Sequence, residues 1–213
     1  GLVGSEMCIR DSLSRMLSGP YATMLLADHG AEVIKIESAE GDSSRRSGPF
    51  KEDELKKNWS GYFISLNRNK KSISLNLKNG DDLAFFKKLI EKSDVLVENF
   101  RPGVMNRLGL SFDEVSKINP TIVYGSISGF GSDIFGESPY KNWPSYDVVA
   151  QAMGGLISLT GYDDENPIKV GPGIADIFSG SLLSFGLLAS ILKTRDTGRA
   201  QFVEVAMYDA IIS

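Results

Sequence analysis

The chain has 213 residues, of which 42% are hydrophobic and 23% are charged, so it can bury a sizeable core. Its 23 Lys and Arg against 27 Asp and Glu give a net charge of −4, and without a long basic patch this argues against a nucleic-acid partner. The longest apolar run, residues 182–192, is interrupted by Ser184, Gly186 and Ser190. We therefore expect a buried helix there and no membrane partner.

The two ends of the chain carry separate expectations. Residues 1–12 lack periodicity, a basic start and an apolar core, and they look like the translation of a sequencing-library adaptor. We expect them to lie outside the fold. Cys8, the one cysteine, falls among them, which leaves no disulfide or thiolate chemistry beyond residue 12. Residues 201–213 read as a strand running into a short helix, and we expect residues 13–213 to be the N-terminal part of a larger domain, truncated at its C-terminus.

Helical and strand patterns alternate beyond residue 12. The alternation predicts an α/β fold, a Rossmann-like open and mostly parallel sheet flanked by helices. Strands are predicted at residues 31–37, 72–77, 94–98 and 121–127 and from residue 201, and helices at 19–29, 80–91, 104–108, 112–118, 146–153 and 175–193. Residues 38–58 read as a polar loop.

Three strand junctions are candidate ligand sites, because ligands gather beyond the carboxyl ends of parallel strands. They are Gly19-Pro20, residues 98–100 and residues 129–131. None matches a dinucleotide fingerprint or a P-loop, which argues against nicotinamide, flavin and ATP chemistry. One histidine and no cysteine beyond residue 12 argue against a zinc site and a Ser-His-Asp triad, so no metal is predicted.

Asp176 is the most informative residue. It follows the Gly-Pro-Gly turn of residues 171–173 and begins a long apolar helix. Unpaired N–H groups at a helix start keep a carboxylate ionised, and an ionised carboxylate is a nucleophile toward activated acyl groups. The alternative is that Asp176 only caps the helix, which is the commoner role of an aspartate at such a position.

Several motifs in this order give the chain a specific resemblance. They are residues 17–37, 66–73 and 94–103, Tyr146-Asp147 with Gln151-Ala152, Gly180, and residues 197–199. Each is weak alone. Together they resemble the class III CoA-transferases, of the CaiB/BaiF and formyl-CoA transferase type, a family that also includes the α-methylacyl-CoA racemases. The resemblance covers nearly all of residues 13–213.

The resemblance implies a chemistry for Asp176. In the family the aspartate at this position attacks an acyl-CoA thioester to form a mixed anhydride. The released CoA thiolate then forms an enzyme–CoA thioester, from which an acceptor carboxylate collects the CoA. Coenzyme A is thus expected as a co-substrate, with acyl-CoA and a small carboxylic acid as partners and no tightly bound cofactor.

The resemblance also implies a coenzyme A groove. The expected binding residues are Arg15, Met16, Leu17 and Ser18, mainly through their backbone, Leu75 through its backbone, and Asn99, Phe100 and Arg107. Cationic side chains at Arg45, Arg46, Lys70 and Lys71 suit the phosphates of coenzyme A, with a solvated surface as an equal alternative.

Two other functions remain open. Racemases of the family use a histidine and an aspartate, but the histidine position falls near Tyr146, and His29 at the end of the first predicted helix suits a structural role. A non-catalytic CoA-binding homologue is the other alternative, against which Asp176 argues because its charge would repel the phosphates. The resemblance further implies an interlocked homodimer at full length and a cytoplasmic location, and we expect the fragment alone to be poorly soluble and inactive.

Overall fold

The computed structural model describes residues 8–52, 59–163 and 165–213, and its strands form a six-stranded parallel sheet. The strands are β1 (Cys8–Ser12), β2 (Glu32–Glu37), β3 (Lys70–Ser74), β4 (Val95–Glu98), β5 (Val123–Ser128) and β6 (Gln201–Ala206). They lie in the order β3-β2-β1-β4-β5-β6. The chain therefore reverses its direction of growth between β1 and β4, which is where ligands bind in sheets of this topology.

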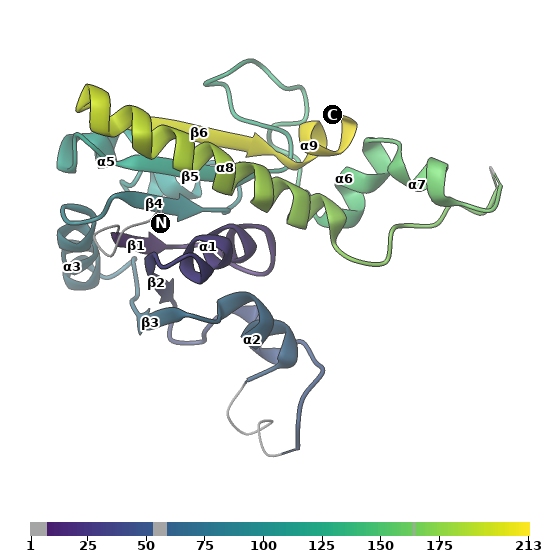
Figure 1. Cartoon of the computed structure of the whole chain (residues 1–213), viewed down its shortest axis with the longest axis horizontal. Helices are drawn as coiled ribbons and strands as arrows, with labels where there is room; N and C mark the ends of the chain where they lie inside the picture. The colour runs from purple at the N-terminus through teal and green to yellow at the C-terminus, as the bar shows by residue number, and fades with distance from the viewer. Residues whose placement is uncertain (1–7, 53–58, 164) are drawn as a thin grey trace.

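Helices cover both faces of the sheet. They are α1 (Ser18–Asp28), α2 (Gly61–Asn67), α3 (Gly80–Ile90), α4 (Val104–Arg107), α5 (Phe112–Ile118), α6 (Asp147–Met153), α7 (Leu156–Thr160), α8 (Ile174–Thr197) and α9 (Met207–Ile212), with a 3₁₀ turn, η1 (Ser43–Arg46). Helices α1 and α8 pack together on one face (Figure 1), and α3 and α5 contribute to the core of the other. The predicted α/β architecture is confirmed.

Alternate side chains of β4 belong to two hydrophobic cores, one on each face of the sheet. Val95 and Val97 belong to the core under α1 and α8, whereas Leu96 between them belongs to the core under α3 and α5. All three side chains are fully buried. A strand buried on both faces reads as a continuous apolar run, which is why residues 94–98 gave a clear strand prediction.

A close approach of α1 and α8 positions the candidate site. A Cβ added at Gly180 would lie 2.7 Å from the carbonyl oxygen of Ser18, so only glycine allows the two helices to meet here. Asp176 lies one turn before Gly180 on α8, and Ser18 is the first residue of α1. The contact at Gly180 therefore brings the first turns of the two helices together.

Helix α8 is long and apolar enough, by length and composition, to cross a membrane, and among the described residues it is the one such helix. It packs against α1, β5 and β6 in the structure. Leu183 and Leu187 on its inner face are fully buried. The predicted helix around residues 182–192 is present and its inner face is buried, but the prediction is only partly correct, because Phe185 and Leu192 on the outer face are 74% and 53% exposed.

The structure corrects the prediction for the beginning of the chain. The expectation that residues 1–12 lie outside the fold is wrong for residues 8–12, which form β1 between β2 and β4. Residues 1–7 lie outside the described residues. Hydrogen-bonding partners on both sides order this strand, and its sequence carries no alternating pattern that could have predicted it. Helices α2 and α7 were not predicted either, and the third strand begins at Lys70 instead of residue 72.

Candidate active site

A cavity of about 380 Å³ lies at the carboxyl edge of the sheet, beside the point where the chain reverses between β1 and β4. We call it the Asp176 cavity. It brings together most of the residues predicted from the sequence, namely Arg15, Met16, Leu17, Ser18, Asn99, Phe100 and Asp176. These residues come from the β1–α1 loop, the turn after β4 and the first turn of α8.

Asn99 joins two of these segments. Its Oδ1 accepts a hydrogen bond from Arg15 N at 2.8 Å, and its Nδ2 donates to Arg15 O at 2.8 Å. The same Nδ2 donates to Ser18 Oγ at 3.1 Å. Since this bond uses a lone pair of the Ser18 hydroxyl, the hydroxyl proton stays available for Asp176. The amide side chain of Asn99 thus orients both the loop and the serine.

Asp176 does not cap its helix. The N-cap residue of α8 is Gly173, which has no side chain to do so. The backbone N–H of Ala175 instead donates to Asp147 Oδ1, from α6, at 2.8 Å. Asp147 Oδ2 accepts from Gln151 Nε2 at 2.7 Å, which holds the Asp147 carboxylate in place. The capping role is therefore filled from another helix, and the Asp176 carboxylate is left to face the cavity.

The surroundings of Asp176 raise its pKa to about 6. Burial is the main cause and the negative charge of Asp147 adds to it, while hydrogen bonds from the hydroxyl and backbone N–H of Ser18 act in the opposite direction. The sequence had suggested that the helix start would favour the charged form. Burial outweighs that effect, yet a carboxyl group with a pKa of about 6 is still about nine-tenths ionised at pH 7. Asp176 is thus a charged carboxylate with no cationic partner at hydrogen-bonding distance among the described residues.

Glu98 supports the turn that carries Asn99 and Phe100. Its Oε2 accepts a hydrogen bond from Phe100 N at 2.8 Å, and its Oε1 accepts from Ser126 Oγ. Burial raises the pKa of Glu98 to about 7, although the hydrogen bonds from Ser126 and Phe100 oppose the rise. Sequence reasoning had used this residue only as part of a motif.

Two predicted coenzyme A ligands lie away from the Asp176 cavity. Leu75 packs at the margin of the core under α3 and α5, and its N–H donates to Glu37 O at 2.8 Å, continuing the pairing of β2 with β3. Arg107 is exposed at the end of α4. Neither residue lines the cavity, and a contact of either with coenzyme A stays a prediction.

The predicted phosphate partners have other contacts. Arg45 pairs with Glu37 and stacks over the ring of Phe63, and Lys71 pairs with Glu32. Lys70 donates to Pro20 O at 2.7 Å, and burial holds its pKa well below the usual value. These three cations line a separate cavity of about 240 Å³ beside β3 and α2. The structure does not bring them to the Asp176 cavity.

Sequence reasoning missed some of the cavity wall. Tyr62 on α2 lines it, and burial, with Asp176 next in effect, raises the pKa of its hydroxyl to about 12. Trp143 from the β5–α6 connection also lines it, as does Tyr146, which the sequence had already placed near the histidine position of racemases. The one available signal was Ser60, which caps α2 by accepting from Phe63 N at 2.9 Å, and a serine before an apolar stretch is a recognised helix start.

His29 lies at the C-terminal end of α1, where its Nδ1 is 2.7 Å from Leu25 O. It does not line the Asp176 cavity. The predicted structural role at a helix end is therefore the one supported by its contacts. The described residues also contain no cluster of His, Cys, Asp and Glu that could hold a metal ion.

Comparison with known proteins identifies relatives that match most of the chain. The sequence model of CoA-transferase family III matches residues 12–213. Succinyl-CoA:mesaconate CoA-transferase of Haloarcula marismortui is 43% identical over 94% of this chain and 51% of its own length. Formyl-CoA:oxalate CoA-transferase of Streptomyces coelicolor is 44% identical over 94% of this chain and 47% of its own length. Succinyl-CoA:glutarate CoA-transferase of Mus musculus is 40% identical over 90% of this chain and 42% of its own length.

A solved structure gives the same result for the fold. The CAIB/BAIF family protein from Brucella suis superposes with a TM-score of 0.89 at 34% identity, over 99% of this chain and 54% of that one. The chain spans about half the length of the curated relatives it matches.

Proposed function

The chain belongs to CoA-transferase family III, and we propose that the whole protein transfers coenzyme A from an acyl-CoA donor to a carboxylic acid through a covalent intermediate on Asp176. The observation that carries the proposal is the position of Asp176. A carboxylate that pairs with no cation among the described residues faces a cavity at the start of α8, close to Ser18 at the start of α1. A perturbed pKa in a cavity is typical of functional residues.

The proposed reaction needs only carboxyl exchanges. A carboxylate oxygen of Asp176 attacks the thioester carbonyl carbon and the C–S bond breaks, which leaves a mixed anhydride and the CoA thiolate. The thiolate attacks the Asp176 carbonyl carbon of that anhydride, which releases the donor acid and leaves an enzyme–CoA thioester. The acceptor carboxylate repeats the two steps in reverse, and the Asp176 carboxylate is regenerated with a new acyl-CoA.

The first turn of α1 supports this chemistry. Ser18, the first residue of α1, lines the cavity, and its backbone N–H and hydroxyl hydrogen-bond to the Asp176 carboxylate. Donors in this position stabilise the negative charge that forms on oxygen during acyl transfer. The high pKa of Asp176 relative to an ordinary aspartate also makes it a better nucleophile once it is ionised.

Epimerisation of a branched acyl-CoA is less well supported. A racemase needs a proton-transfer pair with pKa values near the working pH. Tyr146 lines the cavity where the family pattern places a histidine, and the chain's single histidine is bonded at the end of α1. Transfer of CoA requires no such pair.

The names of the relatives suggest which substrates to test. Mesaconate, oxalate and glutarate are the acceptors in their names, and succinyl-CoA and formyl-CoA are the donors. We propose that this protein uses small carboxylic acids of the same kind. We further propose that the whole protein is an interlocked homodimer and is cytoplasmic, as the family resemblance implies.

A transfer assay on the full-length protein tests the proposal. Each donor is incubated with each acceptor, and the acyl-CoA products are separated by liquid chromatography and identified by mass. We expect a new acyl-CoA with at least one pair. Epimerised or merely hydrolysed donor, with no CoA on any acceptor, would contradict the proposed transferase.

A further inference from the structure

Lys35 and Asp42 form a deeply buried ion pair beside the site. The distance between Lys35 Nζ and Asp42 Oδ2 is 2.8 Å, and each side chain is 1% exposed. Lys35 lies on β2, and Asp42 lies in the loop that follows this strand. A buried ion pair is a poor way to gain stability, because apolar residues of similar volume often stabilise a core equally well. A contribution to stability alone therefore does not explain why this pair is buried here.

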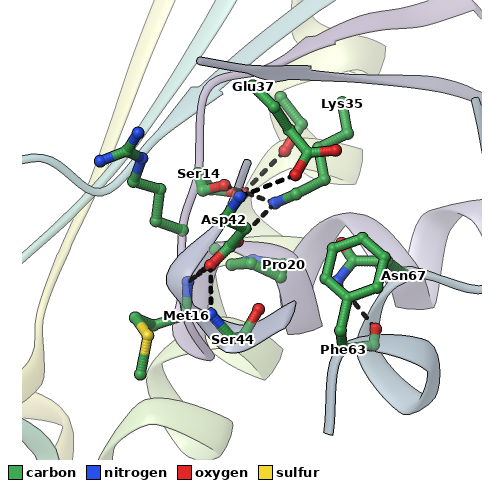
Figure 2. Close-up of polar contacts among 12 residues, drawn as sticks. Ser14, Met16, Pro20, Lys35, Glu37, Asp42, Ser44, Phe63 and Asn67 are labelled. Carbon is green, nitrogen blue, oxygen red and sulfur yellow. Dashed lines mark hydrogen bonds and ion pairs between the residues drawn. The ribbon is translucent and has the colours of Figure 1, made fainter. Parts of the chain in front are cut away.

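Both members of the pair bind the backbone of the loop between β1 and α1 (Figure 2). Lys35 Nζ donates to Ser14 O at 2.8 Å. Met16 N donates to the Asp42 carboxylate and lies 3.3 Å from each oxygen. The carboxylate also accepts from Ser44 N at 3.0 Å, which fixes it to its own loop. The ion pair thus ties residues 14–16 to β2 and to the loop after it.

The backbone of Met16 is held in an unfavourable conformation. Its φ is 62°, in the left-handed region that residues other than glycine adopt only at an energetic cost. The residue is 40% exposed, so burial of the methionine offsets only part of that cost. The hydrogen bond from Met16 N to Asp42 favours this conformation, and Ser43 Oγ also donates to Met16 Sδ at 3.0 Å. Strain of this kind is concentrated at functional sites.

The held segment is a wall of the Asp176 cavity. Arg15 and Met16 both line it. On the opposite side, Asn99 binds the N–H and the C=O of Arg15, at 2.8 Å each. The loop is therefore fixed from β2 by the ion pair and from β4 by the amide of Asn99.

We infer that the Lys35–Asp42 pair positions residues 14–16 so that the Asp176 cavity is already formed before coenzyme A binds. The two side chains are positioning residues, because they act on the ligand through the loop backbone. The identity of the ligand rests on the function proposed above. A binding site held in its bound shape loses less conformational entropy on binding, so loss of the pair weakens affinity.

A matched control is available at the other end of the sheet. Asn119 is 7% exposed, and its Nδ2 donates to Ile90 O at 2.9 Å and to Ser93 O at 2.8 Å. Like the ion pair, it is a buried polar group that holds a loop backbone. It lies before β5, at the amino edge, whereas the Asp176 cavity lies at the carboxyl edge. Asn119→Ala therefore removes comparable contacts far from the cavity.

The test uses the full-length protein and the double variant Lys35→Met/Asp42→Leu, which keeps a similar side-chain shape but removes both contacts to the loop. Coenzyme A binding is measured by titration calorimetry, amide exchange at Met16 by mass spectrometry, and stability by thermal melting. We expect the double variant to bind coenzyme A at least about tenfold more weakly and to exchange faster at Met16. Asn119→Ala should melt lower yet bind within about twofold of the wild type.

Two results would overturn the inference. One is a double variant that binds coenzyme A no more weakly than Asn119→Ala, and the other is exchange at Met16 that matches the wild type. A wild-type protein that does not bind coenzyme A would contradict the proposed function instead. In that case the exchange rate at Met16 still decides whether the pair holds the loop.

Discussion

Asp42 and Asp176 lie at the same edge of the sheet, but their surroundings shift their pKa values in opposite directions. Burial acts to raise the pKa of Asp42, yet the charge of Lys35 and hydrogen bonds from Lys35 and Ser44 outweigh it, and the pKa falls below its usual value. In the part of the chain that the structure describes, no such cation pairs with Asp176, and burial together with Asp147 raises its pKa to about 6. A paired carboxylate is fixed in one role in the fold, whereas an unpaired one remains free to react.

The largest expected effect comes from substituting the unpaired carboxylate, Asp176, and it is an effect on activity. Asp176→Asn removes the proposed nucleophile, so the transfer rate of the full-length protein should fall by at least about 10⁴-fold. Its melting temperature should not fall, because burial and the charge of Asp147 outweigh the hydrogen bonds from Ser18 and make the charged form of Asp176 unfavourable in the folded state. Transfer assays measure the rate, and thermal melting measures the stability. A variant with more than a tenth of the wild-type rate would rule out this role for Asp176.

Breaking the Lys35–Asp42 pair should have a different effect, a large loss of stability. Lys35→Met leaves the Asp42 carboxylate buried without its cation, and such a loss costs about 3–5 kcal/mol in the free energy of unfolding. Chemical denaturation measures this value, and Asp176→Asn is the matched comparison. Equal free energies of unfolding for Lys35→Met and Asp176→Asn would contradict the claim that Asp42 depends on its cation for stability while Asp176 does not.

Acid should destabilise the region around the Lys35–Asp42 pair, because Glu37 takes up a proton at low pH. Hydrogen bonds from Arg45, Ser72 and Asp42 lower the pKa of Glu37 from 4.5 to about 2, although burial, the largest single effect, acts to raise it. A carboxyl group with a lowered folded-state pKa stabilises the fold above its unfolded value. Stability on the order of 3 kcal/mol should therefore be lost as the pH falls from 4.5 to 2. Denaturation across this range should show the loss in the wild type and a smaller one in Glu37→Gln.

The smallest expected effect concerns the pH dependence of catalysis. The rate should fall below pH 6 as the Asp176 carboxylate takes up a proton. Asp147→Asn keeps an oxygen for the N–H of Ala175 but removes a charge that raises the pKa of Asp176. Its acid limb should lie about one pH unit or less below that of the wild type. An acid limb at a higher pH than that of the wild type would contradict the effect of Asp147 on the pKa of Asp176.

The sequence predicted the parts of the structure that depend on local patterns. Helix α5 was predicted with its observed bounds, and the Gly-Pro-Gly turn placed Asp176 at the start of α8. The family resemblance assigned Asp176, Asn99 and residues 15–18 to one site, and all of them line the same cavity. The rule that ligands gather beyond the carboxyl ends of parallel strands had separately indicated the junction at residues 98–100.

Long-range pairing accounts for what the sequence did not predict. Lys70 was predicted to be either a phosphate partner or a solvated surface cation, but its Nζ donates to Pro20 O in α1, fifty positions away. The Lys35–Asp42 pair depends on how the loop after β2 folds back, and no sequence pattern describes that. Likewise Tyr62 reaches the cavity only because α2 packs on α1.

The most direct test of the central claim is to trap the covalent intermediate. The full-length protein is incubated with succinyl-CoA or formyl-CoA, hydroxylamine is added, and modified peptides are mapped by mass spectrometry. We predict a hydroxamate on Asp176 that is absent from Asp176→Ala. An unmodified Asp176 in a protein that still moves CoA to its acceptor, or a hydroxamate on another residue, would contradict the account.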